Sequence, residues 1–175
     1  MPVQRSIVIT GFMGSGKTCV ANALAKLLRC SAVDLDNEIT RREGRTPAEL
    51  ITQTGEATFR EIESAVLRNV LERGPQIVAL GGGAWTIAAN RTLITEFNGF
   101  SIWLDVPFER CWRRIDAAGS NRPLAPDRQT AKALYDLRRP LYELAALRME
   151  ARDVNAEELA RRVVGALPKN VAPQS

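Results

Sequence analysis

The chain has 175 residues, of which 45% are hydrophobic and 25% are charged, values typical of one globular domain with a sizeable core. The absence of any run of about 18 apolar residues argues against a transmembrane helix. We therefore expect a single domain over residues 1–168 and a disordered tail over residues 169–175. Because the N-terminus also lacks a signal-peptide pattern, we expect a cytoplasmic location.

The net charge of +4 indicates a mildly basic surface, or one that attracts anionic small molecules. No five-residue block of Lys and Arg occurs, and no basic patch is interleaved with aromatic residues, so we expect no nucleic-acid partner. We expect a small-molecule substrate, no membrane partner and a monomer.

Histidine is absent from the sequence, and the cysteines are few and scattered. Cys19, Cys30 and Cys111 are far apart and form no Cys-x-x-Cys pair. This composition argues against a zinc site of the Cys/His type and excludes a histidine-based catalytic triad. All three cysteines are expected to be buried, reduced thiols.

Short apolar runs alternate with helical patterns along the chain. The predicted strands are residues 6–10, 32–35, 76–80 and 100–104, with a weaker fifth strand at 148–154. The predicted helices are residues 16–29, a mostly helical stretch that is clearest at 57–73, a helix from 108, residues 128–149 with a kink or break at Pro140, and residues 157–167. Apolar strands that are each followed by a helix are typical of an α/β fold whose parallel sheet is buried on both faces.

Residues 11–18, Gly-Phe-Met-Gly-Ser-Gly-Lys-Thr, fit the phosphate-loop pattern G-x-x-x-x-G-K-[ST] between a predicted strand and a predicted helix. Glycines in such a loop let successive backbone N–H groups point at phosphate oxygens, and the helix N-terminus adds partial positive charge. We expect Lys17 to reach the β- and γ-phosphates and the Thr18 hydroxyl to ligate Mg²⁺. The motif predicts nucleotide binding but does not define the fate of the γ-phosphate.

A second carboxylate for the metal is expected at the end of a neighbouring strand. The third predicted strand ends in Gly81-Gly82-Gly83, so the candidates are Asp34 and Asp36 after the second strand and Asp105 after the fourth. One of the first two would serve the metal and the other the acceptor hydroxyl, although Asp36 alternatively caps the following helix. For Asp105 a structural role is favoured.

The three consecutive glycines bury no side chain and raise the conformational entropy lost on folding. Close approach of the backbone to a ligand explains them, with a plain tight turn as the alternative. A loop at about residues 117–128, rich in Gly and Pro, is long enough to move.

Arginine is the preferred side chain for bidentate contacts with carboxylates and phosphates. Arg60 lies on a predicted amphipathic helix, Arg122 lies in the mobile loop, and Arg138 and Arg139 lie on the late helix. An arginine that arrives with a closing loop could stabilise a transferring phosphoryl group. Spacing does not choose between Arg138 and Arg139.

Taken together, these motifs resemble those of shikimate kinases over about residues 5–165. The matching segments are residues 11–18, 34–36 (Asp-Leu-Asp), 55–60 (Gly-Glu-Ala-Thr-Phe-Arg), 81–84 (Gly-Gly-Gly-Ala), 122–124 (Arg-Pro-Leu) and 138–142 (Arg-Arg-Pro-Leu-Tyr). The resemblance implies a three-layer P-loop kinase fold with a five-stranded parallel sheet in the order 2-3-1-4-5. It also implies transfer of the γ-phosphoryl group of ATP to the 3-hydroxyl of shikimate, with Mg²⁺, in aromatic amino acid biosynthesis.

The resemblance also implies roles for individual residues. Asp36 would hold the acceptor hydroxyl and take its proton, and Asp34 would help Thr18 to hold Mg²⁺ through water. Within the acceptor-binding helices at about 36–62, Arg60 would bind the acceptor carboxylate together with Arg138. The other implied contacts are the backbone of Gly82, flanked by Gly81 and Gly83, with a ring hydroxyl; Gly14, Ser15, Gly16 and Lys17 with the phosphates; Arg114 with adenine; and the lid residue Arg122 with the ATP phosphates.

The chain departs from the family pattern at Leu35, at Trp85 and in the lid, and these positions bear on the shape of the acceptor pocket. A P-loop kinase of another hydroxylated acceptor, such as gluconate or a nucleotide, remains an alternative. A nucleotide-binding relative without kinase activity is a second alternative. A GTPase is disfavoured because the guanine-binding string Asn-Lys-x-Asp is absent.

Overall fold

The computed structural model describes residues 4–119, 122–152 and 154–171, and its centre is a five-stranded sheet in the order β2-β3-β1-β4-β5. All four neighbouring pairs of strands are parallel. The strands are β1 (Ile7–Thr10), β2 (Ala32–Asp34), β3 (Ile77–Ala79), β4 (Phe100–Asp105) and β5 (Leu147–Glu150). The predicted α/β fold and strand order are confirmed.

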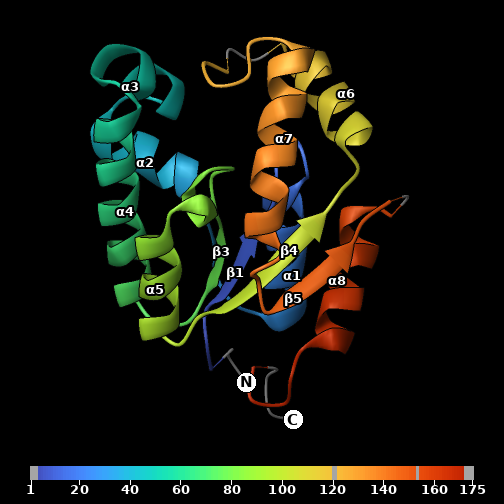
Figure 1. Cartoon of the computed structure of the whole chain (residues 1–175). Helices are drawn as coiled ribbons and strands as arrows, with labels where there is room; N and C mark the ends of the chain where they lie inside the picture. Colours follow the sequence, from blue (N-terminus) through green and yellow to red (C-terminus); the bar gives the residue numbers. More distant parts are fainter. Residues whose placement is uncertain (1–3, 120–121, 153, 172–175) are drawn as a thin grey trace.

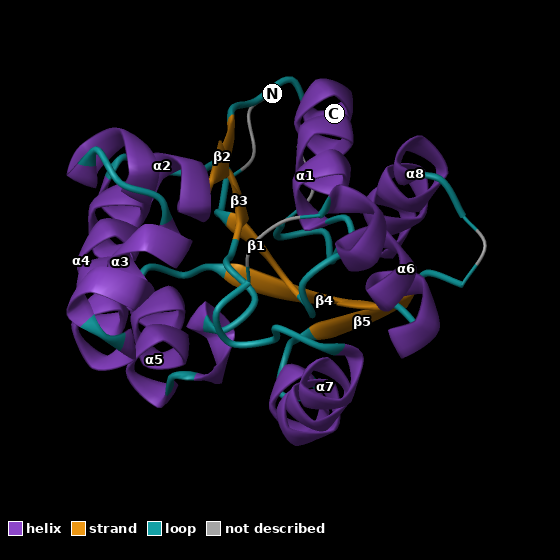
Figure 2. Ribbon diagram, turned by 90° about the horizontal axis from the view of Figure 1, so that it is seen from above, coloured by secondary structure: helices purple, strands orange, loops and turns teal. Residues whose placement is uncertain are grey.

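Helices cover both faces of this sheet. They are α1 (Lys17–Leu28), α2 (Leu35–Glu43), α3 (Pro47–Thr54), α4 (Glu56–Glu72), α5 (Ala88–Glu96), α6 (Phe108–Ala118), α7 (Arg128–Tyr142) and α8 (Ala156–Ala166), with a 3₁₀ turn η1 at Ala84–Thr86 (Figure 1). Figure 2 shows α1, α6 and α8 on one face and α4, α5 and α7 on the other. Every residue of β1, β3 and β4 is therefore buried, which is why these strands are apolar without alternation.

The register of the strands places their carboxyl ends at one edge of the sheet. Asp34 in β2 lies opposite Ala79 in β3, and Ala79 lies opposite Ile9 in β1. The phosphate loop after β1, the start of α2 after β2 and the glycine run after β3 consequently emerge side by side. Ligands of open α/β sheets bind at such an edge.

The helix predicted over residues 128–149 is shorter than expected. It ends at Tyr142, and the strand predicted at 148–154 begins earlier, at Leu147. Pro140 lies inside the helix, two residues before its end, so the hydrogen bond lost with its missing N–H belongs to the last turns and the helix is not broken there. Residues 84–86 and 88–96 also form helices that the sequence analysis did not predict.

The expectation of three buried cysteines is correct only for Cys111. Cys19 is exposed and Cys30 is intermediate. Cys19 lies in the first turn of α1, on the side away from the sheet, where it lines a pocket instead of the core.

The C-terminal segment differs from the predicted disorder where it is described. Val171 is fully buried and its N–H donates to the carbonyl of Pro168 at 2.9 Å. Residues 172–175 of the predicted tail lie outside the described residues, as do 120 and 121 of the predicted lid. Within the described ranges, no helix combines the length and hydropathy needed to cross a membrane.

Candidate active site

The phosphate loop joins β1 to the N-terminus of α1. Gly14 and Gly16 have φ angles of 74° and 90°, and Gly16 is the residue that precedes the first turn of α1. The Lys17 ammonium folds back over the loop and donates to the carbonyls of Gly11 and Phe12 at 2.9 Å. The loop thus presents a helix N-terminus and a buried cation to a space that suits a phosphate chain.

The ammonium of Lys17 is held in an environment that weakens its proton affinity. Burial lowers the pKa of Lys17 to about 8, and the negative charges of Asp36 and Asp34 oppose this shift. Both carboxylates therefore lie close enough to Lys17 to act on it electrostatically, as the sequence analysis required.

Asp34 and Asp36 have separate environments although they are two residues apart. The Thr18 hydroxyl donates to Asp34 Oδ2 at 2.5 Å, and Asp34 Oδ1 accepts the backbone N–H of Asn37 at 3.1 Å. Asp34 is thus the N-cap of α2, so the alternative that Asp36 provides this cap is wrong. A hydroxyl and a carboxylate in contact beside a phosphate loop form the hard oxygen donor set that Mg²⁺ prefers.

Asp36 is the second residue of α2, in its first turn, and lines the cleft. Burial, together with the nearby negative charge of Asp34, raises the pKa of its carboxyl, and Lys17 and Arg122 oppose the shift. A Cβ atom added to Gly81 would lie 2.6 Å from Asp36 Oδ1. The glycine run therefore permits the close approach of Asp36 to the loop after β3.

One cavity brings together the side chains predicted to hold the acceptor. Its lining comes from the phosphate loop, α2, α3, α4, the glycine run, the loop before α7 and α7 itself: Met13, Asp36, Pro47, Ile51, Phe59, Arg60, Glu63, Gly81, Gly82, Gly83, Arg122, Leu124 and Arg138. Three guanidinium groups and the partly buried Asp36 carboxylate thus share a small space. We call this space the acceptor cavity.

Arg60 reaches the acceptor cavity from α4 with its guanidinium already paired. It binds Glu63 Oε2 at 2.7 Å and Glu56 Oε1 at 3.1 Å, and a Cβ atom at Gly83 would overlap it. The absence of side chains in the glycine run is therefore needed for Arg60 as well as for Asp36. This geometry disfavours a plain tight turn as the reason for the three glycines.

Glu63 is a residue of the cavity that the sequence analysis missed. Its side chain is 1% exposed, and its second oxygen, Oε1, has no hydrogen-bond partner among the described residues. Burial raises the pKa of Glu63 to about 7, and the pairing with Arg60 opposes the shift. Its spacing of three residues from Arg60 on one helix face was the available signal.

Arg138 and Arg139 are adjacent but point to different places. Arg138 is buried and lines the acceptor cavity. Arg139 instead binds the carboxylate of Asp105 at the end of β4, with N–O distances of 2.7 and 3.2 Å. The structural role favoured for Asp105 in the sequence analysis agrees with this pairing, and the two arginines cannot exchange places.

Arg122 lies before α7 and lines the acceptor cavity with Arg60 and Arg138. Its Nε is buried and has no hydrogen-bond partner within the described ranges. It also acts electrostatically on both Lys17 and Asp36. Arg122 thus lies near both the acceptor cavity and the phosphate loop.

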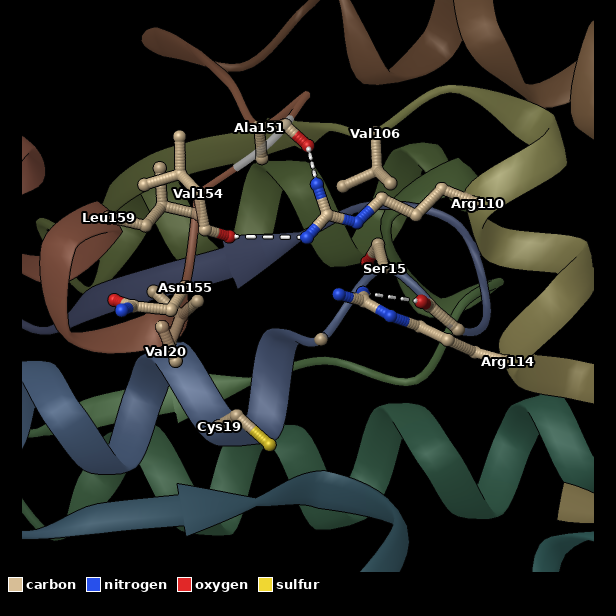
Figure 3. A pocket seen from close by; sticks show the side chains of 13 residues that line it. Ser15, Cys19, Val20, Val106, Arg110, Arg114, Ala151, Val154, Asn155 and Leu159 are labelled. Carbon is tan, nitrogen blue, oxygen red and sulfur yellow. Dashed lines mark hydrogen bonds between the residues drawn. The ribbon is translucent and has the colours of Figure 1, made fainter. Parts of the chain in front are cut away.

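A second cavity, of about 470 Å³, adjoins the phosphate loop on its other side. Arg114 donates to the carbonyl of Gly14 at 3.0 Å, and Arg110 donates to the carbonyls of Ala151 and Val154 at 3.4 and 3.3 Å. Figure 3 shows the two arginines extending from one helix over this space, opposite Val154. Its remaining apolar walls include Val20, Val106 and Leu159. An apolar slot beside a phosphate loop suits a nucleotide base.

Comparison with known proteins decides the family. The sequence pattern described as "Shikimate kinase" matches residues 13–168. The chain belongs to the shikimate kinase family. A shikimate kinase of Cereibacter sphaeroides is 39% identical over 94% of this chain and 83% of that protein, and one of Ruegeria pomeroyi is 37% identical over 94% of this chain and 86% of that protein.

A solved shikimate kinase supports the same assignment at the level of structure. The enzyme of Acinetobacter baumannii in complex with shikimate superposes with a TM-score of 0.85 at 35% identity, covering 91% of this chain and 90% of that chain. The departures at Leu35 and Trp85 therefore occur within a shikimate kinase fold that is otherwise preserved.

The role of Trp85 in this fold is to join the glycine run to the end of α7. Its indole N–H donates to the carbonyl of Leu141 at 2.8 Å, and the Tyr142 hydroxyl donates to the carbonyl of Gly82 at 2.5 Å. Burial raises the pKa of Tyr142 to about 12, so its hydroxyl stays protonated and available as a donor. These two bonds connect the backbone of Gly82 with the helix that carries Arg138.

Proposed function

We propose that this protein catalyses transfer of the γ-phosphoryl group of ATP to the 3-hydroxyl of shikimate, giving ADP and shikimate 3-phosphate. The observation that supports this most directly is the juxtaposition of the partly buried Asp36 with Lys17 on one side and with Arg60 and Arg138 on the other. An anionic acceptor and an anionic donor would meet at that aspartate.

The acceptor would enter with its carboxylate toward Arg60 and Arg138. Two guanidinium groups from different helices can hold a carboxylate by charge-assisted hydrogen bonds. The backbone of Gly82, fixed by Tyr142, would contact a ring hydroxyl. These contacts leave the hydroxyl that reacts beside Asp36, which orients it and accepts its proton as the new P–O bond forms.

The donor would occupy the phosphate loop and the neighbouring cavity. Gly14, Ser15 and Gly16 would cradle the phosphates through their N–H groups, and Arg114 would pack on the adenine. Lys17 and Arg122 would stabilise the charge that develops during the transfer. When bound between Thr18 and Asp34, Mg²⁺ would supply further neutralisation of the phosphate oxygens.

The test is ADP release measured by a coupled assay with and without shikimate, with gluconate and nucleoside monophosphates as further acceptors. We expect ATP consumption to depend on shikimate, with kcat/KM at least about 100-fold above that for the other acceptors. A preference for gluconate or a nucleotide would refute the proposed acceptor. Slow hydrolysis that no acceptor accelerates would refute the kinase assignment.

We also propose that the enzyme acts as a monomer in the cytoplasm. The proposed nucleotide and acceptor sites are both lined by residues of one subunit, so the proposed reaction calls for no residue of a partner. Light scattering coupled to size-exclusion chromatography should give a mass near 19.3 kDa, and a mass of twice that value would contradict the proposal.

A further inference from the structure

Helix α7 presents two consecutive arginines to two different environments. Arg138 lines the acceptor cavity, while Arg139 binds Asp105 at the carboxyl end of β4. Consecutive residues of an α-helix are separated by about 100° around its axis. Because of this fixed angle, a contact that fixes the direction of Arg139 also fixes the direction in which Arg138 leaves the helix.

The contact at Asp105 has the features of a rigid junction. The Asp105 side chain is 8% exposed, and each of its oxygens is bound: Oδ1 by Arg139 at 2.7 Å, and Oδ2 by Arg139 at 3.2 Å and by Arg148 at 2.6 and 2.9 Å. Exposed ion pairs contribute little because water competes for them and the side chains remain mobile. Here the carboxylate is buried and bound in a bidentate way, while the side chains of Arg139 and Arg148 are 34% and 48% exposed, so competition from water is reduced on the carboxylate side of the pair.

The two arginines of this junction also share an aromatic partner. The guanidinium carbons of Arg139 and Arg148 lie 5.0 and 5.1 Å from the ring centre of Trp103, a buried residue of β4. Cation–π contacts of this kind restrict the guanidinium planes further. Arg139 and Arg148 therefore make the same two kinds of contact, one from α7 and the other from β5.

A further bond links the junction to the body of α7. Arg139 donates to the hydroxyl of Tyr135, one turn earlier, and that hydroxyl donates to the carbonyl of Val106 at 3.0 Å. The Tyr135 ring also packs edge-on against Phe12 of the phosphate loop, with centroids 5.2 Å apart. The face of α7 that carries Tyr135 and Arg139 is thus held to the end of β4, to Val106 just after it and to the phosphate loop.

We propose that Asp105 and Arg139 form a positioning pair, which sets the rotation of α7 on the sheet and so aims Arg138 at the carboxylate of the acceptor. Neither residue lines the acceptor cavity, so neither is expected to touch the substrate. The identity of the acceptor in this inference rests on the proposed function, but the orientation of α7 does not.

The test compares Arg139→Met with Arg148→Met. Both substitutions remove one arginine from Asp105 and from Trp103, but only the first removes a contact of α7. We expect KM for shikimate to rise about ten-fold in Arg139→Met, with KM for ATP and kcat within about two-fold of wild type. Arg148→Met should stay within about two-fold of wild type in all three constants. Equal effects of both variants, or an unchanged KM in Arg139→Met, would overturn the proposal.

An acceptor without a carboxylate distinguishes misplacement of Arg138 from a general loss of activity. The methyl ester of shikimate lacks the charge that Arg138 would bind, so Arg139→Met should change its kcat/KM by less than about two-fold. A loss as large as that seen with shikimate would show that the substitution only loosens the fold, and would refute a positioning role.

Hydrogen exchange of the free enzyme provides a readout that needs no substrate. We expect the amides of α7 near residues 135–142 to exchange faster in Arg139→Met and at the wild-type rate in Arg148→Met. Unchanged exchange in both variants would refute the inference. Absence of shikimate turnover in the wild type would refute the proposed function alone, since the exchange result would still decide the role of the pair.

Discussion

At the scale of single residues, the proposed reaction depends on the basicity of the Asp36 carboxylate. Asp36 has a raised pKa because burial and the charge of Asp34 disfavour its ionised form, and Lys17, Arg122 and Arg60 each oppose that shift. A raised pKa makes the ionised carboxylate a stronger base, so in the proposed reaction Asp36 would accept the proton of the acceptor hydroxyl.

Replacement of Asp36 with Asn should remove the proton acceptor and keep the shape of the side chain. We expect kcat to fall by at least about 100-fold, because general base catalysis typically contributes that much, while the Kd for ATP stays within a few-fold of wild type. Steady-state kinetics and calorimetric titration with ATP measure the two quantities. A variant that retains wild-type kcat would show that Asp36 does not act on the hydroxyl.

The lowered pKa of Lys17 predicts how activity depends on pH. Burial lowers its pKa to about 8, so the free enzyme loses the ammonium charge as the pH rises through that value. Because a neutral amine does not stabilise phosphate charge, kcat/KM for ATP should fall about ten-fold per pH unit above pH 8. The fall in kcat at saturating ATP should begin at higher pH, since bound phosphates favour the charged lysine. A kcat/KM profile that stays flat to pH 9.5 would contradict this role.

At the scale of elements, the acceptor cavity depends on how α7 is attached to the glycine run after β3. Trp85, in the 3₁₀ turn that follows the glycines, donates its indole N–H to the carbonyl of Leu141 near the end of α7. The same carbonyl also accepts the backbone N–H of Leu144 at 3.2 Å, so Trp85 adds a side-chain bond from the glycine run to a helix end that is already capped.

Replacement of Trp85 with Phe should keep an aromatic ring at this buried position and remove the indole bond to the carbonyl of Leu141. We expect the free energy of unfolding to fall by about 1–3 kcal/mol, because a hydrogen bond is lost and the smaller ring leaves part of the buried space empty. Denaturant unfolding followed by circular dichroism measures this change. As a matched control, Trp112→Phe on α6, where the side chain is only partly buried, should cost less than about 1 kcal/mol. Equal losses in both variants would contradict the attachment role.

Sequence periodicity was sufficient for most elements and failed where tertiary contacts determine the boundaries. The helix from Lys17 and the strands at Ile7 and Phe100 follow from local patterns. The end of α7 at Tyr142 does not, because the hydrogen bonds that stabilise it come from Trp85 and to Gly82, more than fifty residues away in the chain. Helix α5 was missed because residues 88–96 show only a weak apolar stripe.

At the scale of the whole molecule, one sheet supports both halves of the cleft. β1 lies between β3 and β4, so the phosphate loop that follows it is flanked by the glycine run on one side and by Asp105 on the other. Ile9 in β1 is fully buried between the two helical layers. The stability of this strand therefore underlies the nucleotide site and the acceptor site together.

Replacement of Ile9 with Ala should destabilise the whole domain. We expect a loss of about 2–5 kcal/mol in the free energy of unfolding, because the substitution leaves a cavity in the core. Loss of helical signal and loss of activity should coincide on heating, as in a cooperative transition. Leu27→Ala, at a side chain that is 47% exposed on α1, should cost less than about 1 kcal/mol. If activity is lost at a much lower temperature than secondary structure, the sites do not depend on the stability of β1 in this way.

Local sequence patterns were sufficient to predict the phosphate loop at residues 11–18, the α/β class, the order of the main elements and the set of candidate acids and arginines. These features depend on local patterns: hydrophobic periodicity, glycine at sharp turns, and a lysine and a hydroxyl at a helix start. The family resemblance added the strand order and the choice of Arg138, both of which agree with the structure.

Which of those residues stabilise the fold and which line the cleft is visible only in their three-dimensional contacts. The fold made Asp34 the cap of α2, placed Asp36 against Gly81, paired Arg139 with Asp105, and brought the unforeseen Glu63 to Arg60. Except for the local cap at Asp34 and the pair on α4, these contacts join segments more than thirty residues apart. They arise when parallel strands align their carboxyl ends at one edge, which local sequence patterns do not encode.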